Sequence, residues 1–401
     1  MSARLGAERI VIVGGGIIGL SIAEHLLRRG HRAVVVEKGE IAREASWASS
    51  GFLELRAASG KGEEFFRLTQ RSCGLFGPWV ERLKKDSGID PEYVHSRSLD
   101  LVFDDEDDER VRALERRLEA LGIPGHWLEG HEVLRREPSI SPEATRAFFL
   151  DHPHQVRVPR LNKALEKTLR QADVALWDHT EVLGFERRGE RLQGVITSRG
   201  PLPADRVVLA AGAWSSQLAR DLHLPFSTRP IRGQALLLRQ TPGRLRHLLF
   251  ADDGYLVPRL DGRLFIGSTE EDVGFERATT AGGISRLSQL ALRCVPDLAS
   301  VPMEASWSGL RPGSADGLPY LGRVRSLENL WVATGHFTHG VVLAPLTGEW
   351  MARSLLGEST QDELAAFDPE RDRERLAVEA DRSSPPALSE WKADPSPSRQ
   401  A

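Results

Sequence analysis

The sequence predicts an α/β fold in which a domain built on a parallel sheet carries an inserted domain with an antiparallel sheet. Short β-branched and apolar runs, typical of buried parallel strands, alternate with helical patterns and lie at 10–13, 33–36, 207–210 and 330–333. A glycine-rich turn connects the first of these runs to a helix. Hairpin and loop signals are concentrated in 90–150 and 225–305, which indicates a second domain inserted twice into the first.

The residues around the glycine-rich turn predict a dinucleotide site. Gly14 permits a tight turn, Gly16 lets backbone N–H groups approach a pyrophosphate, and Gly19 lets helix and strand pack closely. The second strand ends in Glu37, whose carboxylate can bind both ribose hydroxyls and would repel a 2′-phosphate. This Rossmann-like pattern alone does not distinguish FAD from NAD.

A chain of 401 residues is longer than one hydrophobic core normally supports, so two domains are expected. The cofactor-binding domain is predicted to be discontinuous, over 1–85, 150–222 and 305–372. The substrate domain is predicted over 86–149 and 223–304. The end of the chain, 373–401, is rich in Pro and Ser and is predicted to be a flexible tail.

Composition bears on partners and compartment. A net charge of −4 and a sequence pI near 6.3 give no reason to expect a nucleic acid or an anionic membrane as partner. No apolar run approaches the roughly 18 residues of a membrane-spanning helix, and the stretch before Glu8 is too short for a signal peptide. Cys73 and Cys294 lack metal-like spacing, which favours a reducing compartment without disulfides. We therefore expect a cytoplasmic protein.

Other stretches could border the cofactor. Residues 43–53 are rich in small and polar residues, and form either a polar linker or a loop lying against a flat ring. A buried strand leads into Gly212, where backbone could approach the cofactor. The apolar helix predicted at 341–350 has no N-cap side chain, so its free N–H groups could bind a ligand anion. His336 and His339 precede this helix without a third ligand, so we expect no metal site.

The dipeptide Asp261-Gly262 between two apolar strands predicts a two-residue hairpin turn. This register would place Tyr255 opposite Ser268, with Glu270 diagonally beside Tyr255 on one surface. Glu270 would then either border a pocket and attract an ammonium group, or face solvent.

Arg311 is predicted to lie between glycine-rich turns, in the stretch Trp307-Ser308-Gly309-Leu310-Arg311-Pro312-Gly313. It is either a surface arginine or a cation that binds a ligand. From this stretch alone both alternatives stay open.

Seven blocks of the sequence occur in a characteristic order: Gly14-Gly15-Gly16-Ile17-Ile18-Gly19, Arg43-Glu44-Ala45-Ser46-Trp47-Ala48, Gln155-Val156-Arg157, Ala211-Gly212-Ala213-Trp214-Ser215, Val257-Pro258-Arg259, Gly309-Leu310-Arg311-Pro312 and Gly335-His336-Phe337. Together they resemble the D-amino acid oxidase superfamily of FAD-dependent amine oxidases, and within it the glycine oxidases of thiamine biosynthesis. The resemblance runs from Ile10 to Trp350, and several ordered blocks are far more specific than one.

The resemblance implies FAD in extended form. Related sarcosine oxidases attach the flavin through a cysteine near 310–311, where this chain has none, so the FAD should be non-covalent. The pyrophosphate would lie at Gly14, Gly16, Ile17, Ile18 and Gly19, the adenosine ribose at Glu37 and Lys38, and the adenine at the backbone of Val182. The phosphates and flavin would be bordered by Ala45, Ser46, Ser50, Gly51 and Phe52. The pyrimidine edge would face His336, Phe337, Thr338, His339, Gly340, Val341 and Val342, where the helix dipole would stabilise the reduced flavin.

For the substrate, the resemblance implies that Arg311 binds a carboxylate as a bidentate fork and that Tyr255 hydrogen-bonds the same group. Hydride would pass from the α-carbon to flavin N5 without a side-chain acid or base, the imine would hydrolyse, and O₂ would reoxidise the flavin to give H₂O₂. Two positions near the expected substrate depart from the family pattern. Thr338 replaces a second arginine of some glycine oxidases, and Glu270 replaces an apolar residue.

The expected reaction is oxidative deamination of glycine, sarcosine or small D-amino acids, which would supply thiazole synthesis. Alternatives in the superfamily are a D-amino acid dehydrogenase that reduces a quinone and an N-methyl amino acid oxidase. An alternative of another class is a flavin-binding module without amine chemistry, in which Arg311 braces the fold; an NAD-dependent dehydrogenase is more distant. Family members are often homotetramers, so the resemblance also implies a homo-oligomer.

Overall fold

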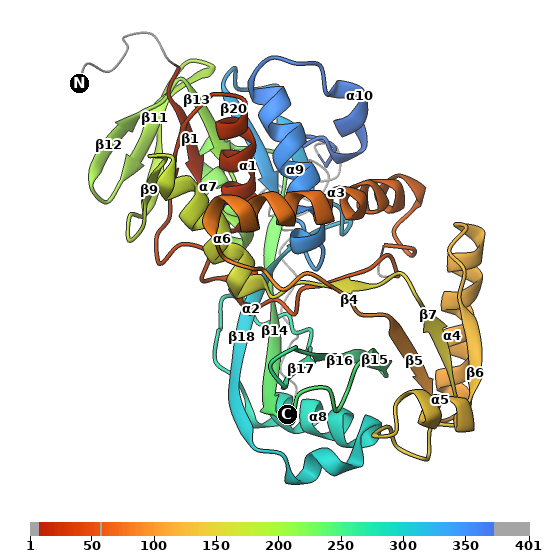
Figure 1. The fold of residues 1–401 in the computed structure, drawn as a ribbon. Coiled ribbons are helices and arrows are strands. Elements are labelled where there is room, and N and C mark those ends of the chain that lie inside the picture. Colours follow the sequence, from red (N-terminus) through yellow and green to blue (C-terminus); the bar gives the residue numbers. More distant parts are fainter. Residues whose placement is uncertain (1–7, 57, 373–401) are drawn as a thin grey trace, which may run out of the picture.

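The computed structural model describes residues 8–56 and 58–372, in which helices pack on two large sheets (Figure 1). The six-stranded sheet has the order β19-β20-β13-β1-β2-β9 and is parallel except at its β19 edge. The predicted α/β class and the four predicted parallel strands are confirmed. The strands of this sheet are β1 (Ile10–Val13), β2 (Ala33–Val36), β9 (Ala175–Trp177), β13 (Arg206–Leu209), β19 (Tyr320–Arg323) and β20 (Leu330–Thr334).

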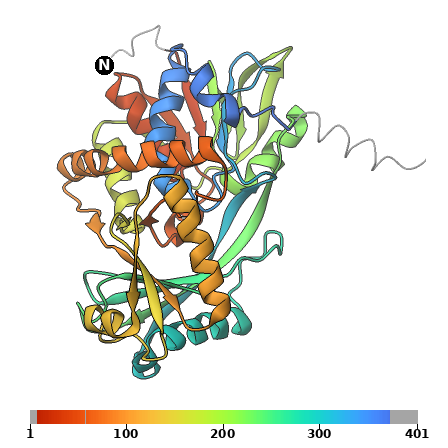
Figure 2. The ribbon, with the colours of Figure 1, turned by 90° about the vertical axis from the view of Figure 1, so that its right-hand side faces the viewer.

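One face of this sheet is covered by four helices, which bury the largest hydrophobic cluster with it. They are α1 (Ile17–Arg28), α3 (Glu63–Ser87), α6 (Val158–Gln171) and α9 (Gly340–Leu355). Helices α1 and α9 approach closely because Gly348 has no side chain where Ser21 and His25 of α1 lie, and the Ser21 hydroxyl donates to the Ala344 carbonyl at 2.7 Å. Figure 2 shows α3 crossing the ends of these helices.

The opposite face packs against a small antiparallel sheet of β10 (Val182–Arg188), β11 (Arg191–Thr197) and β12 (Gly200–Pro203). Short helical segments follow β13 on this side: η1 (Gly212–Trp214), α7 (Ser215–Ala219) and η2 (Arg220–Leu222). The C-terminal segments α10 (Gln361–Leu364) and η4 (Ala365–Phe367) complete the unit. The predicted tail at 373–401 lies outside the described residues.

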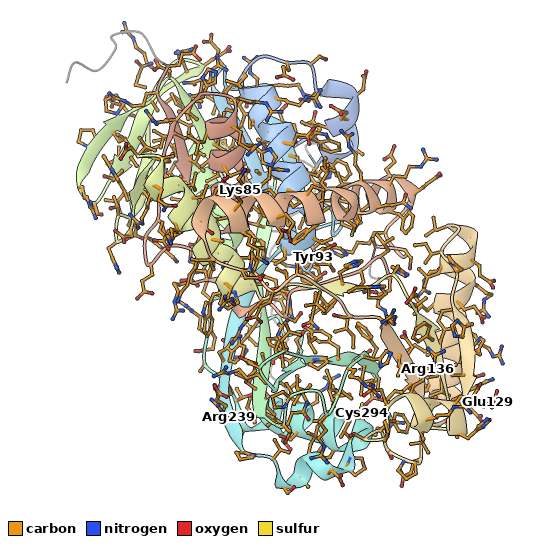
Figure 3. The ribbon with its side chains drawn as sticks, in the orientation of Figure 1. Lys85, Tyr93, Glu129, Arg136, Arg239 and Cys294 are labelled. Carbon is orange, nitrogen blue, oxygen red and sulfur yellow. The ribbon has the colours of Figure 1, made fainter. Side chains whose placement is uncertain are left out.

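The second large sheet has eight strands in the order β18-β14-β17-β16-β15-β5-β7-β6. Its strands are β5 (Ser98–Val102), β6 (His126–Glu129), β7 (Arg146–Leu150), β14 (Thr228–Arg239), β15 (Leu248–Ala251), β16 (Gly254–Pro258), β17 (Arg263–Gly267) and β18 (Met303–Ser314). All pairs are antiparallel except β15 with β5. One face carries α8 (Ala281–Cys294), which ends at the buried Cys294 labelled in Figure 3.

The remaining elements are helical segments that pack on the eight-stranded unit and short segments that lie between the two units. They are α2 (Ala45–Ala48), β3 (Phe52–Leu53), β4 (Val94–His95), α4 (Asp105–Ala120), α5 (Gly130–Arg136), β8 (His154–Gln155) and η3 (Pro296–Ser300). The long strands β14 and β18 run from the eight-stranded sheet toward the six-stranded sheet in both views (Figure 1 and Figure 2). Among the helices in the described part of the chain, none has the length and apolar character needed to cross a bilayer.

The hairpin between β16 and β17 differs from the predicted register by one residue. Its loop has three residues, with Gly262 in the left-handed conformation at a φ of 85°, a common alternative to the two-residue turn. Tyr255 consequently pairs with Gly267, and the predicted pairing with Ser268 is wrong.

The expectation that Arg311 lies between turns is also wrong, because Arg311 is in the long strand β18, opposite Ile231 of β14. The glycines on either side of it serve close packing. A Cβ atom on Gly309 would lie 2.6 Å from the Cβ of Ala48. Strand β18 also crosses the domain boundary predicted at residue 305, and the other predicted boundaries stay predictions.

Candidate active site

A cavity of about 440 Å³ lies where the carboxyl ends of β1, β13 and β20 meet β14, β16, β17 and β18. Ligands of α/β proteins bind at this edge of a parallel sheet. The predicted site residues that line the cavity are Gly14, Gly16, Ile17, Ile18, Glu37, Lys38, Ala45, Ser46, Ser50, Phe52, Val182, Gly212, Tyr255, Arg311, His336, Phe337, Thr338, Gly340, Val341 and Val342.

Four predicted site residues lie outside this lining: Gly19, Gly51, His339 and Glu270. The two glycines permit close packing around the cavity. A Cβ atom on Gly19 would collide with the Gly14 carbonyl, as the sequence predicted, and a Cβ atom on Gly51 would collide with the Val156 carbonyl. They therefore shape the wall without forming its surface.

The start of α1 forms a cradle at one end of the cavity. Gly14 has a φ of 112°, and a Cβ atom there would collide with the Ala210 carbonyl. Gly16, the N-cap residue, gives the helix no side-chain cap. The Ile17 N–H instead donates to Ser46 Oγ at 3.0 Å, which holds α2 over the helix start. The N–H groups and positive end of α1 thus face the space where an anion would be stabilised.

Glu37 is fixed in the cavity wall by two backbone N–H groups. Its carboxylate accepts from Gly15 at 2.8 Å and from Gly39 at 3.1 Å, one on each oxygen. Each carboxylate oxygen has two lone pairs, so these bonds orient the group and still leave acceptor capacity. The predicted contact between Glu37 and a ribose stays a proposal that this geometry supports.

Lys38 and Trp214 close the end of the cavity farther along β2. Lys38 Nζ lies 3.2 Å above the centre of the Trp214 ring, a distance at which cation–π attraction is effective. Val182, at the start of β10, lines the cavity beside them. These flat and apolar surfaces suit an aromatic base.

The N-terminus of α9 faces the cavity from another side. Gly340, Val341 and Val342 line it, and the helix has no side-chain cap. The neighbouring histidines add no charge, because burial lowers the pKa of both His336 and His339 to about 3. The positive field at this end therefore comes from the backbone of α9 and from Lys61, whose Nζ lies 5.3 Å from the centre of the Phe337 ring.

Close to the segment that precedes α9, where the Phe337 N–H donates to the Pro312 carbonyl at 3.0 Å, the guanidinium group of Arg311 lies over Gly233 of β14. A Cβ atom on Gly233 would collide with Cζ and both terminal nitrogens of Arg311, so this glycine makes room for the fork. Arg311 Nη1 donates to the Thr269 carbonyl at 3.1 Å, and Nη2 donates to Ser268 Oγ at 2.6 Å. Within residues 8–56 and 58–372, no carboxylate lies within 4.0 Å of this guanidinium group. A half-buried cation with remaining donors is thus presented to the cavity.

Aromatic side chains form the walls beside Arg311. The ring of Tyr255 lies edge-on to Phe52 at 4.7 Å and stacks with Phe265 at 6.2 Å. The Tyr255 hydroxyl donates to Ser268 Oγ at 3.2 Å, so it points to the same place as the Arg311 fork. The arrangement leaves an acid-binding corner next to apolar walls.

Arg259 connects two of the sequence blocks with the loop that contains Ser50, behind this corner. It donates to Gln155 Oε1 at 2.7 Å and to the Val156 carbonyl at 3.3 Å, and it also donates to the Ser50 carbonyl. Gln155 Nε2 in turn donates to the Pro258 carbonyl at 2.9 Å. Burial lowers the pKa of Arg259 to about 10. The α2–β3 loop is thereby fastened to the hairpin that carries Tyr255.

The two positions that depart from the family pattern have different surroundings. Thr338 lines the cavity, and its hydroxyl lies 3.0 Å from His339 Nδ1. Glu270 is exposed and outside the lining, so the structure favours the solvent-facing alternative. The altered hairpin register removes the argument that placed Glu270 beside Tyr255.

The profile of the DAO family, described as FAD dependent oxidoreductase, matches residues 9–354. The chain belongs to this family. It is 36% identical over 367 residues to a glycine oxidase of Pseudomonas aeruginosa, covering 90% of this chain and 99% of that protein. It superposes on the crystal structure of glycine oxidase from Geobacillus kaustophilus with a TM-score of 0.86 and 33% identity, covering 91% and 99% of the two chains. It is also 32% identical to a bifunctional protein ThiO/ThiG of Trichormus variabilis, covering 89% of this chain and 54% of that protein.

As a member of this family, the protein is FAD-dependent, and the cavity fits the cofactor. The glycine cradle at α1 admits no additional Cβ at Gly14, and two helix starts whose N-cap residues supply no capping side chain face the cavity at separate points. Neither Cys73 nor Cys294 lines the cavity, which agrees with non-covalent binding. Bound FAD supplies a two-electron acceptor for oxidation of the substrate.

Two contributors to the site were not predicted. Ser268 was placed on the hairpin, but its bonds to Arg311 and Tyr255 depend on the pairing of β14 with β18 and β17, which no local pattern shows. Arg259 was included in a family block without a role. The signal available in the sequence was an arginine next to the predicted hairpin turn, together with the distant block that begins at Gln155.

Proposed function

We propose that this protein oxidises the amino group of glycine, and of sarcosine or small D-amino acids, with O₂ as the electron acceptor. The observation that carries the proposal is the Arg311 guanidinium group, half-buried beside Tyr255 in the FAD cavity and without a carboxylate partner among the described residues. A fork of this kind pairs with a carboxylate through two parallel hydrogen bonds. The relatives that are named glycine oxidases support the same assignment.

Each residue around Arg311 has a specific role in the proposed reaction. Arg311 and Tyr255 would hold the substrate carboxylate, which fixes the α-carbon relative to the cofactor. Phe52 and Phe265 bring apolar rings close to that point, which favours a small or absent side chain. Among the described residues, no carboxylate, histidine, lysine or second arginine hydrogen-bonds Arg311 or Tyr255, so orientation carries the catalysis when the amine is neutral.

The overall reaction would be glycine + O₂ + H₂O → glyoxylate + NH₃ + H₂O₂. The α-carbon loses a hydrogen with both bonding electrons and the nitrogen loses a proton, which gives an imine, and water hydrolyses the C=N bond. The two electrons reach O₂ through the cofactor, which yields H₂O₂.

The test is a substrate screen for H₂O₂ release with glycine, sarcosine and D-alanine, repeated with Arg311→Ala. Removing one side of a buried charge pair should weaken substrate or transition-state binding by about 2–5 kcal/mol. Arg229→Ala, which removes an exposed arginine of β14, is the matched control and should leave kcat/KM unchanged. Unchanged kinetics in Arg311→Ala would remove Arg311 from the reaction.

Anaerobic mixing separates this proposal from its rivals. Glycine should bleach the flavin spectrum of the purified protein, whereas a flavin-binding module without amine chemistry would keep it. Bleaching followed by reoxidation with a quinone but not with O₂ would indicate a dehydrogenase.

We further propose that the imine product is used for thiazole synthesis. We also propose that the protein is cytoplasmic and forms a homotetramer. The ThiO/ThiG relative supports the link to thiamine, since ThiO there shares a chain with a second protein of the pathway. Growth of a thiazole-requiring strain that lacks its own glycine oxidase would test the pathway, and sedimentation would test the assembly.

A further inference from the structure

One hydroxyl group lies where the two carboxylate-binding side chains converge. Arg311 Nη2 donates to Ser268 Oγ at 2.6 Å, and the Tyr255 hydroxyl donates to the same oxygen at 3.2 Å. These donors come from β18 and β16, and Ser268 directly follows β17, so three strands meet at this atom. Ser268 also lines the cavity.

The hydrogen-bonding capacity of a hydroxyl limits what Ser268 can do next. A serine oxygen accepts at two lone pairs and donates one hydrogen. Arg311 and Tyr255 occupy both lone pairs, so the remaining O–H must point away from them. The group is therefore a donor whose direction is set by the two side chains that bind it.

The segment that carries Ser268 is itself anchored. The Thr269 carbonyl accepts from Arg311 Nη1 at 3.1 Å, and the buried Thr269 hydroxyl accepts from the Gln234 N–H at 3.0 Å. One hydrogen on each terminal nitrogen of Arg311 is thus used by residues 268–269, which leaves a second hydrogen on each nitrogen for a ligand. The fork is held in one orientation before any substrate arrives.

We propose that Ser268 is a substrate-positioning residue that orients Arg311 and Tyr255 and donates its own hydrogen to the substrate carboxylate. This inference rests on the proposed function, because it assumes that Arg311 binds a carboxylate. Holding the fork and the phenol in place before binding reduces the entropy lost when substrate is ordered. The second hydrogen on each terminal nitrogen of Arg311 and the Ser268 O–H are three donors available to a carboxylate, and they select an acid over an uncharged amide, because an amide NH₂ cannot accept from them.

The experiment compares Ser268→Ala with Ser268→Thr in the FAD-loaded full chain. Acetate, which has the carboxylate but no amine to oxidise, is added to the protein in increasing amounts, and the change in flavin absorbance measures its binding. Acetamide serves as the uncharged analogue. We expect Ser268→Ala to weaken acetate binding about 10- to 100-fold, the range for a lost hydrogen bond to a charged group. Ser268→Thr, which keeps the hydroxyl, should recover most of that loss.

Kinetics give a second readout that a merely structural role would not produce. The fall in kcat/KM for glycine in Ser268→Ala should lie mainly in KM, and FAD affinity should stay within about twofold of the wild type. Ser306→Ala, which removes an exposed hydroxyl of β18, is the matched control and should change neither value. If Ser268→Ala fails to load FAD, Ser268→Cys replaces it, because a thiol has similar size but donates only weakly.

The outcomes separate this inference from the proposed function. If Arg311→Ala abolishes acetate binding while Ser268→Ala and Ser268→Cys bind acetate within twofold of the wild type, the role of Ser268 is refuted and the carboxylate site stands. If acetate binding survives Arg311→Ala, the carboxylate site itself is refuted. A selective loss in Ser268→Ala, recovered by Ser268→Thr, supports the proposal.

Discussion

Gly233 lies beneath the guanidinium group of Arg311, so that a Cβ atom on this glycine would collide with three atoms of the fork. The two residues belong to adjacent strands, and the missing side chain is what allows Arg311 to lie flat along the cavity wall. The position of the Arg311 guanidinium group therefore depends on a residue that makes no polar contact with it.

Gly233→Ala should displace the Arg311 fork without disturbing the cofactor end of the cavity. A shift of about 1 Å in a positioning group can lower activity about 100-fold, so we expect kcat/KM for glycine to fall by about 10- to 100-fold. Steady-state kinetics and the FAD content measure the two effects. Gly184→Ala, in the exposed sheet of β10 where a Cβ meets no atom within 4 Å, is the control. A normal kcat/KM in Gly233→Ala would show that the fork tolerates displacement.

Arg259 should be essential for the order of the loop that carries Ser50 and Phe52. Arg259→Met keeps the length of the side chain but leaves the carbonyls of Ser50 and Val156 and the Gln155 amide without their donor. Buried acceptors that lose a charged donor destabilise a protein by about 1–3 kcal/mol. Urea unfolding should detect a loss of this size, accompanied by weaker FAD binding.

The matched control for Arg259 is Arg187→Met, which removes an exposed arginine bonded only locally, to the Gly189 carbonyl at 2.6 Å. It should leave both the unfolding midpoint and the FAD affinity unchanged. Equal behaviour of the two variants would mean that Arg259 does not hold the loop.

Cys294 should be unreactive in the folded protein. It is fully buried at the end of α8 (Figure 3), and burial raises its pKa to about 12, so almost no thiolate is present at neutral pH. In a Cys73→Ser variant, Ellman's reagent should label the native chain at least about 100-fold more slowly than the chain in 6 M guanidinium. Labelling at equal rates would contradict the burial of this thiol.

The cofactor half of the molecule could be predicted because its signals are local. The β1–α1–β2 unit is encoded by contiguous residues, in which a β-branched run, a glycine-rich turn and an apolar helix follow one another directly. The bare start of α9 was likewise visible as a helix with no capping side chain.

The substrate half was harder to predict because glycine occurs both in turns and in strands that pack closely. Gly309 and Gly313 suggested turns, whereas in β18 they serve close packing. The hairpin register was off by one because Gly262 adopts a left-handed conformation in a three-residue loop, which the Asp-Gly pair alone does not distinguish from a two-residue turn. Ser268 could not be connected with Arg311 from sequence, because they meet only after distant strands pair.

The buried histidine His336 should make stability depend on pH. Burial lowers its pKa from about 6.5 to about 3, so between these values the unfolded chain binds a proton that the folded chain does not. The contribution is fully present above pH 6.5 and is lost as the pH falls toward 3. At most about 1.4 kcal/mol is lost per pH unit for each such group.

Other buried histidines titrate in the same way, so the test is a difference between variants. In His336→Gln the loss of unfolding free energy between pH 7.5 and pH 5.5 should be smaller than in the wild type by about 1.4 kcal/mol, because the amide does not titrate. Thr347→Val removes the hydroxyl that lies 3.2 Å from His336 Nε2 but leaves the titrating ring. Thr347→Val should lower the free energy of unfolding equally at both pH values. If His336→Gln instead keeps the pH dependence of the wild type, the His336 ring is protonated in the folded protein.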